Sequence, residues 1–172
     1  MAKKPSSEPK LNVLIRNYAS EIAELEETLH NPKLDFGYRF LFPNRKNPMH
    51  KPITIVKPKK KKYIEIGIGL SITGKHKDCL EKLDEEKKRQ LFFEFQKIFF
   101  SKEVQFELDF KSLRFAFHKN IYFEGNSLSR VSILKTITKI FSIAMLTIIL
   151  LEQFRDEKVD FSKRSFGPSI YT

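Results

Sequence analysis

The chain has 172 residues, of which 41% are hydrophobic, and this is long enough for one domain with a true core. Its 17 Phe against 8 Pro and 6 Gly argue for a packed interior and against disorder. The formal net charge is +11, and the single cysteine, Cys79, excludes an internal disulfide framework and an all-cysteine zinc site. One thiol fits a reducing compartment.

The first elements follow from the spacing of apolar residues. Residues 1–10 are polar and lack the apolar core of a secretory signal, so we expect a disordered basic tail and a cytoplasmic protein. From Leu11 to Leu29 apolar residues recur every three or four positions, which predicts an amphipathic helix that ends before Pro32. Residues 36–42 alternate with period two and predict a strand.

A basic segment, residues 43–62, follows this strand. It holds eight basic residues and no acidic one, so it carries 8 of the 11 excess positive charges. A local field of this density attracts phosphate or an acidic protein surface, and such binding weakens steeply with salt. The candidate binding residues are Arg45, Lys46, Lys51, Lys57, Lys59, Lys60, Lys61 and Lys62.

The lysine run 59–62 leaves several interpretations open. It can be a solvated turn between two strands, where lysines keep the sheet edge from pairing with other chains. It can instead contact RNA, DNA or the ribosome, with Tyr38 and Tyr63 as the nearest aromatic residues for stacking on single strands. An acidic protein or a lipid surface is the third interpretation.

Strands are predicted on both sides of this run, over residues 53–58 and 63–72. Residues 69–75 match the start of the phosphate-binding pattern GxxxxGK[ST], but His76 takes the hydroxyl position and the strand alternation continues through the loop, so we expect no nucleotide hydrolysis. Asp84 caps a predicted helix with an apolar stripe. Phe93 and Phe100 lie off that stripe and either widen the core face or form a second contact.

A hairpin over residues 104–110 and 113–118 and a last helix from about residue 127 to 157 complete the predicted elements. The predicted core stripe of this helix is Leu134, Ile137, Phe141, Ala144, Met145 and Ile148. Five further apolar residues lie off the stripe and form a candidate oligomer or partner interface: Ile133, Ile140, Ile143, Leu150 and Phe154. A dimer would cover them, and so would a helix that runs through the middle of one domain.

The longest nearly apolar run, residues 140–151, has 12 residues and falls short of the roughly 20 that span a bilayer, so we expect no transmembrane segment. Residues 158–172 read as a C-terminal tail. The predicted order α-β-β-β-α-β-β-α over residues 11–157 is that of a single α+β domain, with an antiparallel sheet packed against helices.

This order resembles the fold of type III secretion chaperones and the related YbjN-like proteins. The stretch 121–129, IYFEGNSLS, is similar to the "IYxDGLT" entry of an uncharacterised archaeal family that is assigned to that fold, and residues 63–95 are similar to the central region of the same family. The resemblance covers about residues 11–157. It implies the fold and a dimer that holds other proteins, and the family has no established activity to transfer.

Catalysis is not indicated, and we expect no cofactor and no metal. His76 and Cys79 supply at most two ligands where zinc needs three or four, and no Gly-x-Ser-x-Gly elbow appears. The first hypothesis is therefore a non-catalytic, homodimeric binding protein, chaperone-like or an adaptor. The alternative is a nucleic-acid or ribosome-associated factor that binds phosphate through residues 43–62.

Overall fold

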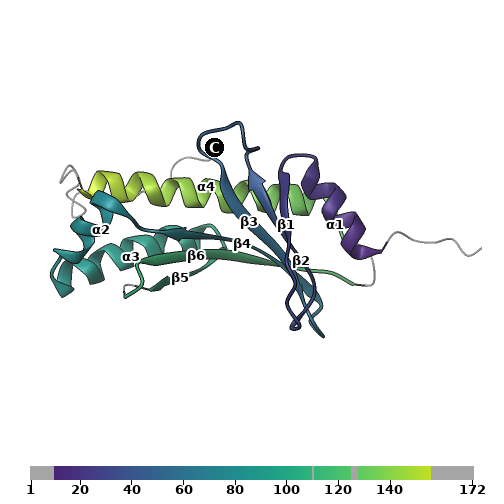
Figure 1. The fold of residues 1–172 in the computed structure, drawn as a ribbon. Coiled ribbons are helices and arrows are strands. Elements are labelled where there is room, and N and C mark those ends of the chain that lie inside the picture. The colour runs from purple at the N-terminus through teal and green to yellow at the C-terminus, as the bar shows by residue number, and fades with distance from the viewer. Residues whose placement is uncertain (1–9, 110, 125–127, 156–172) are drawn as a thin grey trace, which may run out of the picture.

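The computed structural model describes residues 10–109, 111–124 and 128–155, and it shows a six-stranded antiparallel sheet packed against helices (Figure 1). The strands lie in the order β1-β2-β3-β4-β6-β5. The elements are α1 (Leu11–Ser20), β1 (Glu24–Thr28), β2 (Leu34–Phe42), β3 (Lys51–Pro58), β4 (Tyr63–Ser71), α2 (Gly74–Glu81), α3 (Glu85–Ser101), β5 (Gln105–Asp109), β6 (Arg114–Tyr122) and α4 (Arg130–Arg155).

The described helices pack on one face of the sheet, which we call the helix face. The register pairs Ile55 with Ile66 and Ile68 with Phe117, so the apolar members of neighbouring strands stand side by side on it. Tyr63 and His118 belong to the alternating residues that point the other way, onto the open face. Figure 1 shows α4 running along the length of the sheet, with α1 at one end and α2 and α3 at the other.

The α+β class and the antiparallel sheet are confirmed, but the predicted element order is wrong at two places. Residues 24–28 form the edge strand β1 instead of continuing the first helix, which ends at Ser20. An additional helix, α2, precedes α3. The order is therefore α-β-β-β-β-α-α-β-β-α. The expected tails, residues 1–10 and 158–172, lie outside the described residues apart from Lys10.

The sequence prediction for α3 and for the hairpin is confirmed. The Asp84 carboxylate accepts a hydrogen bond of 2.8 Å from the Lys87 backbone N–H, as an N-cap does. The side chains of Leu91, Phe95 and Phe99 are buried. The Phe99 ring centroid lies 5.0 Å from that of Phe117 on β6, so α3 is fixed to the sheet by aromatic contacts.

The predicted stripe of α4 is rotated from the observed one. Ile137 and Ala144 of the predicted stripe are buried, but so are Ile133 and Ile140 beside it, whereas Phe141 and Ile148 are only partly buried. The helix lies across β4 and β6 and is flanked by α1 and α2, so it is covered on more than one side by its own chain. By length and composition alone, residues 130–153 are also long and apolar enough to cross a membrane, a criterion that the core helix of a soluble protein meets as well.

Candidate functional site

Four of the five residues of the candidate oligomer or partner interface on α4 are buried within the chain. Ile133 and Ile140 have no exposed surface, Ile143 is 3% exposed and Leu150 6%. These side chains pack on the sheet and the neighbouring helices and are not accessible to another molecule. The side chain of Phe154 lies outside the described part of the structure. Of the two coverings that were left open, the central position of α4 explains the four buried residues.

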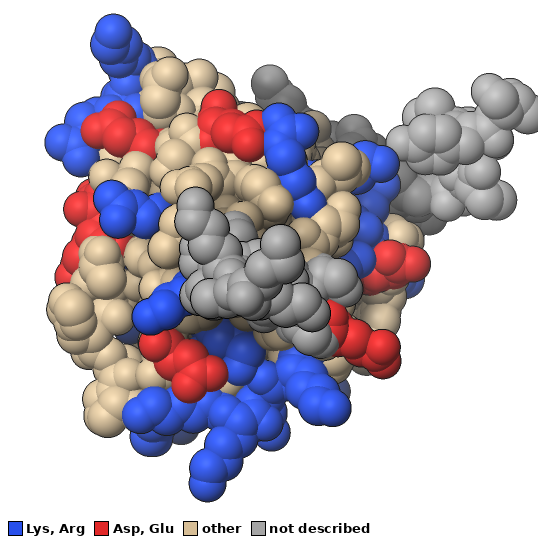
Figure 2. Space-filling view, turned by 90° about the vertical axis from the view of Figure 1, so that its right-hand side faces the viewer, with Lys and Arg blue, Asp and Glu red and all other residues tan. Residues whose placement is uncertain are grey.

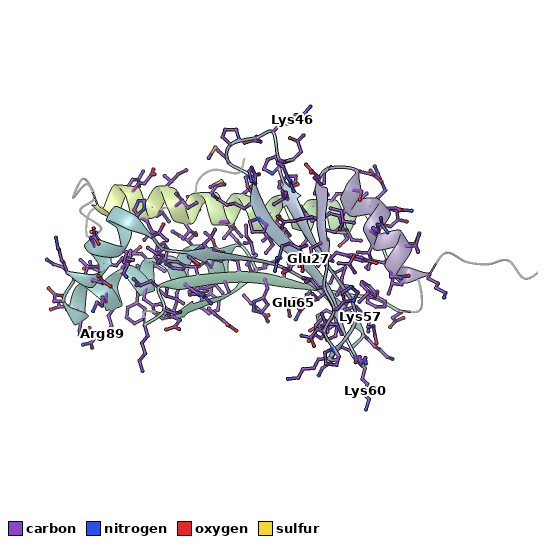
Figure 3. All side chains as sticks on the ribbon, viewed as in Figure 1. Glu27, Lys46, Lys57, Lys60, Glu65 and Arg89 are labelled. Carbon is purple, nitrogen blue, oxygen red and sulfur yellow. The ribbon has the colours of Figure 1, made fainter. Side chains whose placement is uncertain are left out.

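The basic segment 43–62 does not form one patch. Residues 43–50 connect β2 to β3 and residues 59–62 connect β3 to β4, so the two loops lie at opposite ends of β3. Figure 3 shows Lys46 at one edge of the molecule and Lys60 at the other. Eight residues of extended strand separate the loops by roughly 26 Å. The positive charges that are close together in the sequence are therefore divided between the two ends of β3.

Two residues of the segment are engaged in ion pairs. Arg45 lies beside Glu24, with its Nε atom 3.5 Å from a carboxylate oxygen, and its backbone N–H donates to the same side chain. Lys57 is only 8% exposed, and its Nζ donates to Asp35 at 2.9 Å and to the Pro58 carbonyl at 3.1 Å. Because buried charges must be paired, Lys57 is a structural residue. The half-buried Lys51 opens β3, near the β2–β3 loop.

Four exposed lysines lie in the β3–β4 loop, and Lys33 of the β1–β2 loop lies beside them. We call these five residues the lysine end: Lys33, Lys59, Lys60, Lys61 and Lys62. The backbone joins the two contributing loops, since the Lys59 N–H donates to the Lys33 carbonyl at 2.9 Å. All five lysines are exposed, and none forms a salt bridge with a carboxylate of the described residues. Figure 2 shows Lys and Arg gathered at the lower margin of the molecule, apart from those at the top.

Two tyrosines stand beside the lysine end on the open face. Tyr63 and Tyr122 are opposite each other on β4 and β6, with ring centroids 5.4 Å apart and the rings at 61°. Tyr122 is 73% exposed and borders a hollow of about 480 Å³ with Lys62, Phe123 and Glu124. Tyr38 is not part of this group, because it is buried on the helix face with its hydroxyl directed at the Asn12 carbonyl.

An apolar groove lies between α3 and β5, at the edge of the sheet that β5 forms. We call it the α3–β5 groove; its volume is about 470 Å³, and its lining is Phe92, Gln96, Phe100, Glu103, Val104, Gln105, Phe106 and Leu108. Phe100 is 76% exposed at its rim. Among the described residues β5 pairs with β6 alone, so its outer edge keeps backbone groups available for another strand. This exposure excludes, for Phe100, the use as part of a wider core face.

One acidic side chain, Glu103, lines this groove and pairs with Lys119 and Lys139, and Asp109 lies on the adjacent strand β5. Glu103 accepts a hydrogen bond from Lys119, which, with the charges of Lys119 and Lys139, holds the pKa of Glu103 below its ordinary value. The pKa of Asp109 is lowered by hydrogen bonds from the Ser112 hydroxyl and from the backbone N–H of Lys111. Both carboxylates are therefore ionised at neutral pH.

Glu107, between these two carboxylates along the chain, is exposed on the open face of β5. It has no salt-bridge partner among the described residues. Its negative charge is therefore available to a partner that pairs with the edge of β5, and the groove combines apolar side chains on the helix face with carboxylates on the open face.

Other sequence motifs gain no chemistry from the structure. His76 and Cys79 both lie on α2, and no group of three or more potential metal ligands occurs within residues 10–109, 111–124 and 128–155. Residues 69–71 belong to β4 and the helix begins at Gly74, so the phosphate-loop pattern spans a strand end and not a compact loop.

Comparisons with known proteins place the chain among proteins of unknown activity. The family model described as "Uncharacterized conserved protein (DUF2299)" matches residues 11–151. The crystal structure of an uncharacterised protein from Methanothermobacter thermautotrophicus is similar, with a TM-score of 0.72 over 84% of this chain and 98% of that chain at 19% identity. This likeness shows a shared fold. No curated protein matches the sequence.

Proposed function

The chain belongs to the DUF2299 family of uncharacterised conserved proteins, and we propose that it is a non-catalytic protein-binding protein, chaperone-like or an adaptor, that holds its partner at the α3–β5 groove. The observation that carries the proposal is the exposed Phe100 beside the unpaired edge of β5. A large exposed aromatic residue next to a free strand edge is a surface that proteins ordinarily cover. The resemblance to type III secretion chaperones is compatible with this role.

The proposed occupant is an extended segment of another protein that adds a strand to β5. Strand addition supplies main-chain hydrogen bonds, and the alternation of the sheet dictates which side chains meet which face. On the helix face the segment would present apolar residues to Phe106 and Leu108, whose side chains line the groove. On the open face it would present basic residues to Glu107 and Asp109.

A second copy of this chain is a less suitable occupant. If two β5 strands paired antiparallel about Glu107, the two Glu107 carboxylates would stand directly opposite each other, which destabilises a strand pair. Four of the five residues of α4 from which a homodimer was expected are buried within the chain. If two copies associate, we expect them to do so through this groove.

The groove is tested with two short peptides of opposite charge, because the proposal and the net charge of the protein predict opposite preferences. The peptide Lys-Phe-Lys-Leu-Lys-Phe-Lys is expected to bind more tightly than Glu-Phe-Glu-Leu-Glu-Phe-Glu, although the net charge of +11 favours the acidic one. Labelled peptides are titrated with the full chain by fluorescence anisotropy, and amide shifts locate the site. Tighter binding of the acidic peptide than of the basic one at the α3–β5 groove, as located by the amide shifts, contradicts the proposal.

Phe100→Ala provides the residue-level test, and Phe93→Ala is its matched control. Both phenylalanines are exposed on α3, at 76% and 57%, but only Phe100 lines the groove. Truncating Phe100 is expected to weaken binding of the basic peptide about tenfold, whereas truncating Phe93 leaves it unchanged. Equal effects, or none, would show that the groove is not the site. A dimer that Phe100→Ala dissociates, measured by sedimentation, would show that a second copy occupies it.

A further inference from the structure

We propose that the lysine end together with Tyr63 and Tyr122 is a second binding site, whose ligand is a single-stranded nucleic acid. The site lies at the tips of the β1–β2 and β3–β4 hairpins and on the adjacent open face, whereas the α3–β5 groove lies at the edge that β5 forms. The nucleic-acid proposal does not depend on protein binding at the groove, and either proposal can be wrong while the other is right.

The lysines would supply the contacts to phosphate. Five lysines from two adjacent loops carry no competing salt bridge from the described carboxylates, so their charges are available to an external anion. The closely joined backbone, with the Lys59 N–H bonded to the Lys33 carbonyl at 2.9 Å, keeps both loops at one end of the sheet. Lys46, at the opposite end, is too far away to contribute to the same contact (Figure 3).

The tyrosines favour a single strand over other polyanions. Tyr122 offers an exposed aromatic surface, and its ring makes an edge-to-face contact with the ring of Tyr63 on the neighbouring strand, with centroids 5.4 Å apart. Unpaired bases stack on such rings, whereas the bases of a duplex are already stacked on each other and a lipid headgroup has no aromatic face to offer. The hollow of about 480 Å³ between Tyr122 and Lys62 gives a base room beside its phosphate.

Two carboxylates near the site limit its charge. Glu124 borders the same hollow, and Glu65 follows Tyr63 along the open face of β4. The five lysines outnumber them, so the site remains positive. The two carboxylates are compatible with a bound nucleic-acid strand whose phosphates lie along the lysine loops. Its bases, and not its phosphates, would then lie over the tyrosines.

Binding of a labelled twelve-nucleotide oligo-uridine to the full chain, measured by fluorescence anisotropy from 50 to 200 mM salt, tests the site. We expect the single strand to bind more tightly than a duplex of equal charge and more tightly than phosphatidylserine vesicles. Lys59→Glu combined with Lys61→Glu is expected to flatten the slope of log affinity against log salt by about 1.4, since each phosphate contact on a single strand contributes about 0.7. Lys46→Glu with Lys82→Glu has the same net charge and is expected to keep the slope.

The stacking contact has its own pair of variants. Tyr122→Ala is expected to weaken binding about fivefold or more at every salt concentration, without changing the slope, whereas Tyr122→Phe keeps the affinity. Because Tyr122 is 73% exposed, neither change endangers the fold. Equal binding of the two variants, tighter binding of the duplex or the vesicles, or equal salt slopes for the two double-lysine variants would each overturn the proposal.

Discussion

Replacing Phe99 with Ala is expected to lower the free energy of unfolding by about 3–5 kcal/mol, while the same change at Phe100 alters it by less than about 0.5 kcal/mol. The neighbouring residues differ completely in burial, since Phe99 is 0% and Phe100 76% exposed. Among the described residues, Phe99 contacts three other rings, with centroid distances of 5.6 Å to Phe95, 4.8 Å to Phe106 and 5.0 Å to Phe117. Its truncation leaves a cavity between α3 and the sheet.

Urea unfolding at equilibrium, followed by far-ultraviolet circular dichroism, measures both variants. A lower midpoint with an unchanged slope shows lost stability and not a changed unfolded state. The comparison also supports the peptide experiment, because Phe100→Ala must lose peptide binding while it keeps the stability of the parent protein. If Phe100→Ala were as destabilising as Phe99→Ala, Phe100 would be a core residue and the groove would not be an accessible surface.

The strands of the middle of the sheet could be predicted from sequence because their alternation is strict. Ile64, Ile66 and Ile68 point to the helix face and their neighbours to the open one, as the pattern of period two requires. The edge strand β1 could not be predicted in this way. Leu25 and Leu29 continue the helical spacing of α1, and what holds residues 24–28 in a strand is pairing with β2, including the 2.7 Å ion pair of Glu27 with Arg39.

The two proposed binding surfaces depend on distances that local patterns do not contain. The basic segment 43–62 is continuous along the chain, but the extended β3 carries its two loops to opposite ends of the sheet. Lys33 joins the lysine end only through the pairing of β2 with β3, and Tyr122 only through the pairing of β6 with β4. The α3–β5 groove depends on the position of β5 at the edge of the sheet. The sequence pattern shows only that Phe93 and Phe100 lie off the apolar stripe of α3.

The orientation of α4 was not predictable for a different reason. Apolar residues surround the second half of this helix, so periodicity alone does not select the side that faces the sheet. The contacts with β4, β6, α1 and α2 bury one set of residues, centred on Ile140, and leave Ile149 48% exposed. Stability measurements on this helix therefore distinguish a core helix from an interface.

Ile140→Ala is expected to lower the free energy of unfolding by about 2–5 kcal/mol, because the side chain is fully buried and its loss leaves a cavity. Ile149→Ala removes the same atoms from an exposed position of the same helix and is expected to cost less than about 0.5 kcal/mol. Both are measured by thermal unfolding at several protein concentrations. A core residue gives a loss that is independent of concentration. If Ile140 stabilised an interface between copies, its effect would shrink as the proteins are diluted, since the parent protein loses the stabilisation by subunit association through mass action.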